Sequence, residues 1–293
     1  MNSARLGTVV ITGASSGIGR AAALHMARLD YTVHAGVRKP EDGAALEQEA
    51  AGDLRPLRID VTDEEQIQAA AAAVSEATGG RGIAGLVNNA GMAVGGPMEV
   101  IPLADLRRQL EVNLIGQVAV TQAFLPALRL ARGRIVNVTS VGGRVTSPLF
   151  GPYNASKFGL EAVSDVLRME LRPWDIDVSV IEPGSVATDI WDRGGSTADE
   201  VRERMPEQAE ALYGDAMNAG RKAAAEAGAR GIEPEKVAKA IEHALTAKRP
   251  KTRYLIGRDA RGMVGLSALL PARVYDAMVR RAMGMPRNAP REG

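Results

Sequence analysis

The sequence predicts an α/β fold in which helices cover both faces of a parallel sheet of about seven strands. Short runs rich in Val and Ile, without polar alternation, alternate with longer segments of helical periodicity over the first two thirds of the 293 residues. Strands that are apolar on both faces are typical of a parallel sheet buried between two layers of helices. Because crossover connections are right-handed, we expect a doubly wound sheet, formed by one domain spanning residues 1–293.

The expected strands and helices follow one another in regular order. Strands are expected at residues 8–12, 31–37, 54–61, 83–87, 133–139 and 176–182. Helices are expected between them, at residues 20–29, 43–50, 62–77, 103–130 and 153–171. Thr62 followed by Glu65 has the pattern of a capping box, so we expect Thr62 to cap the third of these helices.

The C-terminal third differs in character. Residues 188–230 are polar and helical in pattern, and we expect them to form a substrate lid inserted into the same domain. Pro234 favours the first turn of a further helix, and residues 254–256 are expected to form a seventh strand. Residues 258–293 are expected to form a C-terminal helical extension, in which Val274, Met278 and Ala282 make an apolar stripe that packs on the cleft or on a partner subunit. A basic amphipathic helix on a membrane surface is the alternative.

Composition excludes several classes of protein. The chain has 36 Lys and Arg against 35 Asp and Glu, which argues against a dedicated nucleic-acid binder. It has no cysteine, which excludes disulfides, thiolate metal sites and cysteine nucleophiles, and its 3 histidines are too widely spaced for a metal cluster. No apolar run precedes residue 8, and the apolar stretch at 263–270 is shorter than the about 20 residues that span a bilayer. We expect a cytoplasmic protein with no metal and no integral membrane segment.

A glycine-rich turn joins the first expected strand to the first expected helix. It reads Thr12-Gly13-Ala14-Ser15-Ser16-Gly17-Ile18-Gly19. Glycines at these positions allow a tight turn, a close approach by a pyrophosphate and close packing of helix on strand. The helix N-terminus then offers N–H groups and the positive end of its dipole to the phosphates. The turn alone leaves open a simple connection without a ligand.

Further motifs follow in order along the chain. They are Asn88-Asn89-Ala90-Gly91, Asn113, Ser140, Tyr153-x-x-x-Lys157 and Pro183-Gly184. Together with the glycine spacing, they resemble the short-chain dehydrogenase/reductase family, in its compact branch, over about residues 8–188. The pattern around Ser140 and Tyr153 and the long C-terminal extension are similar to the hydroxysteroid and retinol dehydrogenase subgroup. This resemblance implies a Rossmann-like fold and hydride transfer between a nicotinamide and a carbonyl or alcohol carbon.

The expected catalytic residues are Asn113, Ser140, Tyr153 and Lys157. Tyr153 and Lys157 share one helix face, and a nearby ammonium lowers the pKa of a phenol from its usual value of about 10. Ser140 follows a strand end, where its hydroxyl can hold the substrate oxygen. The resemblance implies that Asn113 holds a helix distortion and a water in a proton relay through Lys157. Each residue alone also has a structural explanation, as a helix-surface or turn residue.

The expected cofactor is NADP(H), with NAD(H) as the less favoured choice. The resemblance implies that the cofactor contacts are Gly13, Ser15, Ser16, Gly17, Ile18, Gly19, Arg38, Asp60, Val61, Asn89, Ala90, Gly91, Tyr153, Lys157, Pro183, Gly184, Val186 and Thr188. In NAD-preferring relatives an acidic residue ends the second strand, whereas this chain has none until Glu41. Arg38 suits a 2′-phosphate instead, because a guanidinium binds phosphate through two parallel bonds. Solvated loop charges at Arg38 and Lys39 are the alternative.

The variable segments carry the substrate prediction. We expect Ser140, Gly142, Leu149, Phe150 and Trp191 to bind substrate, with Met205, Tyr213 and Met217 as further lid residues. The apolar character of residues 141–150 suggests a bulky ketone, aldehyde or secondary alcohol resembling a steroid, retinoid or polyketide.

Two other function classes are considered. One is an NADP(H)-binding redox regulator without turnover, which usually lacks the Tyr or Lys. The other is a sugar-nucleotide epimerase or dehydratase, which the glycine spacing disfavours. The resemblance also implies a homodimer or homotetramer.

Overall fold

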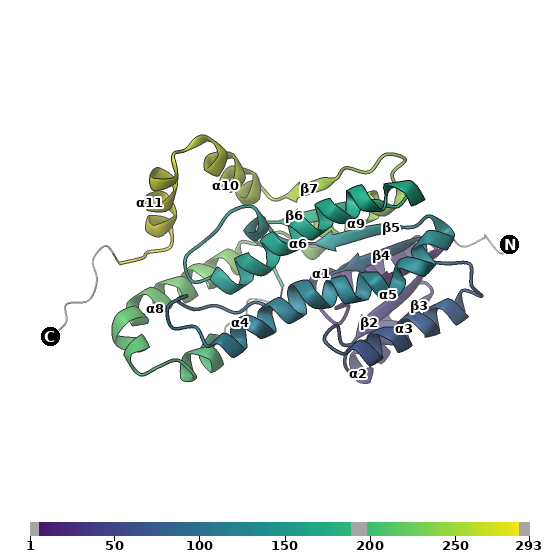
Figure 1. The fold of residues 1–293 in the computed structure, drawn as a ribbon, viewed down its shortest axis with the longest axis horizontal. Helices are drawn as coiled ribbons and strands as arrows, with labels where there is room; N and C mark the ends of the chain where they lie inside the picture. The colour runs from purple at the N-terminus through teal and green to yellow at the C-terminus, as the bar shows by residue number, and fades with distance from the viewer. Residues whose placement is uncertain (1–5, 189–197, 287–293) are drawn as a thin grey trace.

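The computed structural model describes residues 6–188 and 198–286, which form a parallel sheet between two layers of helices (Figure 1). Seven strands pair in the order β3-β2-β1-β4-β5-β6-β7, and every pairing is parallel. The strands are β1 (Thr8–Ile11), β2 (Thr32–Val37), β3 (Leu54–Arg58), β4 (Gly85–Asn88), β5 (Arg134–Val138), β6 (Asp177–Pro183) and β7 (Arg253–Ile256). The doubly wound sheet that the sequence predicts is confirmed.

Three helices pack on each face of the sheet. One face carries α1 (Gly17–Arg28), α2 (Pro40–Glu49) and α9 (Pro234–Thr246), and the other carries α3 (Glu64–Ala77), α5 (Gly116–Ala131) and α6 (Gly151–Glu170). The helices α8 (Gln208–Ala229), α10 (Arg258–Leu269) and α11 (Ala272–Ala282) lie beyond one end of the sheet (Figure 1).

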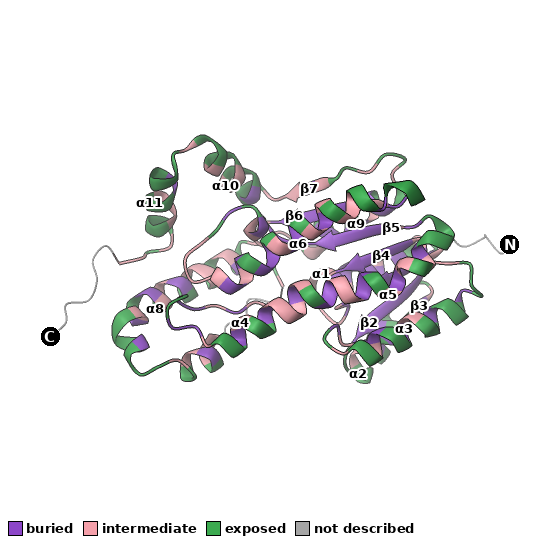
Figure 2. Ribbon diagram, in the orientation of Figure 1, coloured by how far each residue is buried: buried purple, intermediate pink, exposed green. Residues whose placement is uncertain are grey.

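The alternation of side chains along each strand supplies both halves of the core. On β1, Val9 and Ile11 face the cluster that includes α1 and α9, whereas Val10 faces the cluster that includes α3 and α5. All six residues of β2 are buried, as Figure 2 shows for the central strands generally. Because successive side chains point to opposite covered faces, these strands have no polar alternation.

The start of α3 corrects one expectation. Asp63, not Thr62, caps this helix, because Asp63 Oδ1 accepts the Gln66 N–H at 3.0 Å. Thr62 instead donates its N–H and its hydroxyl to Asp60 Oδ1, at 3.0 and 2.8 Å. The helix therefore begins at Glu64, and the capping pattern that starts at Thr62 is one residue too early.

The long helical segment expected at 103–130 is interrupted. It consists of α4 (Leu103–Leu110), a π-helical turn at Glu111–Ile115 and α5. Among the described residues, Leu103–Ala131 is the one helical segment whose length and composition would allow it to span a membrane, with a mean hydropathy of 1.3 over an 18-residue window. The inner face of α5 contributes Val120, Phe124 and Leu128 to the core over the sheet, so the apolar composition also serves packing.

The C-terminal extension corrects a second expectation. The predicted apolar stripe of Val274, Met278 and Ala282 does not pack within this chain, because Val274 is 51% exposed and Ala282 is also exposed. The side chain that α11 buries is Tyr275, with Met278 and Val279 half-buried. The helix is therefore turned by about one residue relative to the prediction, because the larger aromatic ring takes the inward position.

A buried histidine gives a prediction about stability. His34 on β2 is buried, its Nε2 has no hydrogen-bond partner among the described residues, and burial lowers its pKa from 6.5 to about 4. The unfolded chain takes up this proton below pH 6.5 but the folded chain does so only near pH 4, so stability is lost as pH falls through this window. The loss over the window is about 3 kcal/mol.

This loss is measured by urea unfolding of wild type and His34→Leu at pH 7 and pH 4.5. We expect the wild type to lose about 2 to 3 kcal/mol more than the variant between these two values. Equal losses in both chains would show that another group controls the acid limb of stability.

Candidate active site

A cavity of about 1610 Å³ lies at the C-terminal ends of the strands. Its wall includes residues that follow five strands by one or two positions: Gly13, Arg38, Asn89, Ser140 and Gly184. Doubly wound sheets bind ligands at this edge. The cavity continues over α8 to the C-terminal extension, where Met263 and Met283 line it.

The glycine-rich turn fits a phosphate ligand. Gly13 and Gly17 have φ of 64° and 55°, a conformation that favours glycine. A Cβ on Gly13 would lie 2.7 Å from Ala90 Cα, and one on Gly17 would lie 3.0 Å from Thr188 Cγ2. Ser16 precedes α1 without a side-chain cap bond, so its hydroxyl does not occupy the N–H groups of the first turn. The turn therefore offers a narrow cradle at a helix N-terminus.

Gly19 has a different position from the other glycines of the motif. It does not line the cavity, and a Cβ there would overlap Gly13 O and Asn89 Nδ2. Of the predicted cofactor contacts, Gly19 is thus the one that the structure places beneath the turn rather than on its surface. Its lack of a side chain allows α1 to pack on β1.

Asn89 holds two loops together. Its Nδ2 donates to Thr12 O at 3.0 Å and Gly13 O at 3.1 Å, and Thr12 Oγ1 accepts the N–H groups of Asn89 and Ala90 at 3.0 and 3.1 Å. These four bonds fix the turn after β1 against the loop after β4. Ala90 and Gly91 line the cavity beside this junction.

Residues after β2 and β3 form the far end of the same cavity. Arg38 is exposed there and lines the cavity together with Ser15, Asp60 and Val61. Asp60 is already engaged, because its carboxylate accepts both bonds from Thr62. β2 ends at Val37 and is followed by Arg38, so no carboxylate lies at the end of this strand.

Ser140, Tyr153 and Lys157 meet in the middle of the cavity wall. Ser140 follows β5 and is hydrogen-bonded to the Tyr153 hydroxyl, and its Oγ also accepts the Gly142 N–H at 3.0 Å. Tyr153 and Lys157 come from the first turns of α6, with Lys157 Nζ 5.8 Å from the centre of the Tyr153 ring. Lys157 Nζ donates to Val138 O at 2.9 Å.

The protonation of this group differs from the sequence expectation. Burial raises the pKa of Tyr153 above 10, and the hydrogen bond with Ser140 offsets this only in part, so the expected lowering by Lys157 is not found. Burial also lowers the pKa of Lys157 to about 8. At neutral pH the phenol therefore keeps its proton and the lysine is charged in most molecules, an arrangement suited to donating a proton.

Asn113 lies inside the π-helical turn and is fully buried. Its Oδ1 accepts the Met92 N–H and its Nδ2 donates to Met92 O, both at 2.9 Å, with a further bond to Ser156 Oγ at 3.3 Å. The side chain thus holds the loop after β4 against α6.

Two further buried amides were not singled out from the sequence. Gln109 Oε1 accepts the Val94 N–H at 2.6 Å and its Nε2 donates to Met92 O at 3.0 Å. Asn154 Nδ2 donates to Gly142 O at 2.8 Å and Val145 O at 3.3 Å, which fixes the loop after Ser140. Asn within a helix is unfavourable unless it has such partners, so Asn154 beside Tyr153 carries the same signal as Asn113.

The substrate half of the cavity combines apolar and charged side chains. The charged lining residues are Arg107, Arg108, Glu111, Asp199, Arg202, Arg221 and Asp259. Gly142, Leu149 and Phe150 line it as expected, and α8 faces them with small residues. Leu149 has a φ of 68°, and its side chain packs where a Cβ on Gly220 would otherwise lie. The remaining apolar lining includes Met205, Met217, Met263 and Met283.

Trp191, one of the expected substrate contacts in the lid, lies outside the described residues. Tyr213 does not line the cavity, and its hydroxyl instead donates to the Glu99 carboxylate. That assignment to the lid is wrong, because α8 turns this ring toward Glu99.

Comparisons with known proteins agree with this geometry. The family model described as short chain dehydrogenase matches residues 7–199. Retinol dehydrogenase 5 of Mus musculus is 40% identical over 277 residues, covering 92% of this chain and 87% of that protein. The NADPH-dependent 3-dehydrocapnine reductase of Ornithobacterium rhinotracheale is 33% identical over 272 residues, covering 91% and 94%. A short-chain dehydrogenase from Streptomyces avermitilis has a similar structure, with a TM-score of 0.74 and 29% identity over 92% and 93% of the two chains.

Proposed function

Since this chain belongs to the short-chain dehydrogenase family, in its retinol and hydroxysteroid dehydrogenase-like subgroup, we propose that it reduces a bulky apolar ketone or aldehyde with NADPH. Family membership makes the chain an oxidoreductase that transfers hydride with a nicotinamide cofactor. The observation that carries the finer proposal is the hydrogen-bonded Ser140 and Tyr153 pair, with Lys157 beneath it, facing a cavity that Leu149, Phe150 and four methionines help to line.

The proposed roles follow from the position of each group. When bound, the nicotinamide supplies the hydride that reaches the carbonyl carbon. The Ser140 and Tyr153 hydroxyls bind the carbonyl oxygen, and Tyr153 transfers its proton to that oxygen as the alcohol forms. Lys157 stabilises the phenolate that remains on Tyr153, because its ammonium lies against the ring.

The direction of the reaction rests on the protonation of Tyr153. Its raised pKa means that the residue carries a proton at neutral pH and is ready to act as an acid. Alcohol oxidation would require the phenolate as a base, which is scarce until the pH is high. This supports carbonyl reduction as the favoured direction near neutral pH.

The substrate class rests on the lining of the cavity. Leu149, Phe150 and four methionines offer no fixed charge to a ligand, and methionine side chains adapt to irregular apolar shapes. The two relatives described above act, by their names, on retinol and on 3-dehydrocapnine.

A panel of ketones, aldehydes and alcohols, followed at the nicotinamide absorbance, tests this proposal. We expect turnover of apolar carbonyls with NADPH. Binding of NADPH without turnover of any member of the panel would favour the redox regulator instead.

The preference for NADPH over NADH is proposed from Arg38. The side chain lines the cavity where β2 ends, and no carboxylate there would repel a 2′-phosphate. A hydrogen bond to a charged group contributes roughly 1.5–3 kcal/mol, so Arg38→Ala should weaken NADPH binding by about 10- to 100-fold. NADH binding should change little, since NADH lacks this phosphate.

Lys39→Ala is the matched control for Arg38→Ala. Lys39 is an exposed cation next in sequence, but it does not line the cavity. Fluorescence titration of both cofactors should give a near-normal NADPH affinity for this control. Equal weakening of NADPH and NADH in Arg38→Ala would contradict the proposed phosphate contact.

A further inference from the structure

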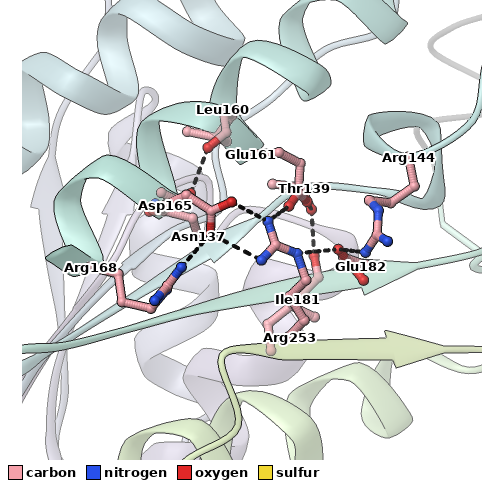
Figure 3. Close-up of polar contacts among 11 residues, drawn as sticks. Asn137, Thr139, Arg144, Leu160, Glu161, Asp165, Arg168, Ile181, Glu182 and Arg253 are labelled. Atoms are coloured by element: carbon pink, nitrogen blue, oxygen red, sulfur yellow. Dashed lines mark hydrogen bonds and ion pairs between the residues drawn. The ribbon is translucent and has the colours of Figure 1, made fainter.

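Acidic and arginine side chains from α6, β6, β7 and the loop after Ser140 form a cluster (Figure 3), and none of them lines the cavity described above. Arg253, at the start of β7, occupies its centre. Its Nη1 and Nη2 donate to the two Asp165 oxygens at 3.0 and 2.9 Å, its Nη2 lies 2.9 Å from Glu161 Oε2, and its Nε lies 3.2 Å from Glu182 Oε1. Arg144, from the loop after Ser140, pairs with the same Glu182 oxygen at 3.0 Å.

Two of these carboxylates are deeply buried. The side chains of Glu161 and Glu182 are 8% and 2% exposed. Burial of an unpaired carboxylate is costly, so both depend on the arginines for their charge. The ion pairs with Arg144 and Arg253 offset the cost of burying Glu182. These pairs do not explain why α6 has an acidic residue, Glu161, one turn after Lys157.

Glu161 and Lys157 lie side by side on α6. They are one helical turn apart on one face, and both are buried. Lys157 Nζ donates to Val138 O, and Glu161 Oε1 accepts the Thr139 hydroxyl at 2.6 Å, so the two side chains reach consecutive residues at the end of β5. A Cβ on Gly143 would lie 3.0 Å from both Glu161 Cγ and Lys157 O, which places the pair beneath the loop after Ser140.

We propose that Glu161 is a positioning residue that keeps the buried Lys157 in its ammonium form, while Thr139 and Arg253 hold the Glu161 carboxylate in place and ionised. The catalytic consequence rests on the proposed function, in which the Lys157 charge stabilises the Tyr153 phenolate. The effect of the Glu161 charge on Lys157 follows from the burial of both side chains on one face of α6 and does not depend on the reaction.

The charges around the pair support this role. Burial lowers the pKa of Lys157, and the Glu161 charge acts against that lowering. Burial likewise raises the pKa of Glu161, and the Thr139 bond and the Arg253 charge oppose that effect, whereas Glu182 adds to it. The titratable and charged groups around the pair are Tyr153 and Asp165 on α6, Glu182 on β6, Arg253 on β7 and Arg144 on the loop after Ser140.

The test measures the Lys157 ammonium directly, in the full chain without cofactor. Lysine labelled with carbon-13 is titrated by NMR, and Lys157→Met assigns the Lys157 signal. Glu161→Gln keeps an oxygen for the Thr139 bond but removes the charge, and we expect the pKa of Lys157 to fall by about one unit. Glu182→Gln is the matched control, since it removes an equally buried charge that shares Arg253, and the pKa of Lys157 should stay near 8.

The pH profile of kcat/KM gives a second measurement. In Glu161→Gln the basic limb should move to lower pH by the same unit, with about fivefold loss at pH 8 and little loss at pH 6. Glu161→Asp retains the charge and should restore most of the profile. A protein whose only defect is looser packing would lose activity without this displacement of the limb.

Three results would overturn the proposal. They are an unchanged pKa of Lys157 in folded Glu161→Gln, an equal fall in Glu182→Gln, and a wild-type Lys157 that has already lost its proton below pH 7. The last result needs no variant, so the proposal stays testable if Glu161→Gln does not fold. The NMR titration also needs no turnover. It therefore decides whether Glu161 acts on Lys157 even if the proposed reaction is not observed.

Discussion

Replacing Tyr153 by Phe is expected to lower kcat for carbonyl reduction by about 10²–10⁴, with little change in NADPH affinity. The substitution keeps the half-buried ring and removes only the hydroxyl that Ser140 holds toward the cavity. Without that proton the developing alkoxide has no donor, whereas the phosphate and ribose ends of the cavity are untouched. Steady-state rates with the best carbonyl of the panel, and fluorescence titration of NADPH, measure the two quantities.

Tyr31→Phe is the matched control for this substitution. Tyr31 is a buried tyrosine whose pKa is likewise raised by burial, but it precedes β2 and does not line the cavity. We expect the control to turn over at close to the wild-type rate. Turnover like that of wild type in Tyr153→Phe would mean that another group donates the proton.

Replacing Lys157 by Met is expected to impair both turnover and cofactor binding. Lys157 lies against the Tyr153 ring and lines the cavity. Loss of a preorganised charge beside a developing anion costs about 10²–10³ in kcat. Loss of a charged hydrogen bond to the nicotinamide ribose, which the family resemblance implies, should raise the Kd for NADPH by about 10- to 100-fold.

The pH profile separates this substitution from the change at Glu161. In the wild type the first group to titrate on the basic side is Lys157, whose pKa is about 8, because the pKa of Tyr153 lies above 10. Lys157→Met removes that titration, so the basic limb should move upward, whereas Glu161→Gln moves it downward. Intact NADPH affinity together with an unmoved limb would show that Lys157 only supports packing.

The sequence was sufficient to predict the sheet and the catalytic group, because both depend on local patterns. The uninterrupted apolar run of β1, Val9-Val10-Ile11, follows from burial on both faces. The ends of three strands, β1, β4 and β5, bring Gly13, Asn89 and Ser140 to one edge. The errors lie where two local signals compete. Thr62 and Asp63 can each cap α3, and only the preference of Thr62 for Asp60 decides between them.

The electrostatics of the site could not be predicted from spacing. The pattern Tyr153-x-x-x-Lys157 indicates an ammonium near a phenol, but the direction of the pKa of Tyr153 depends on how much water the fold removes. Glu161 is one turn after Lys157, yet its partner Arg253 comes from β7. Such a pairing is fixed by the order of strands in the sheet, so no local window of sequence contains it.

The place of Arg253 in β7 has a consequence for the timing of folding on the ribosome. β7 is the last strand in sequence, so Glu161 and Asp165 leave the ribosome long before the guanidinium that neutralises them. Until residue 253 emerges, closing α6 over β5 and β6 would bury Glu161 without its ion-pair partner Arg253, at a cost of about 3–5 kcal/mol. We therefore expect nascent chains stalled before that point to be cut by protease within α6, and chains stalled after β7 has emerged to be protected. Equal protection in both would show that α6 closes without this cation. The catalytic residues are thus completed only near the end of translation, so a truncated chain that contains Ser140, Tyr153 and Lys157 still lacks the charge that lets α6 close over the sheet.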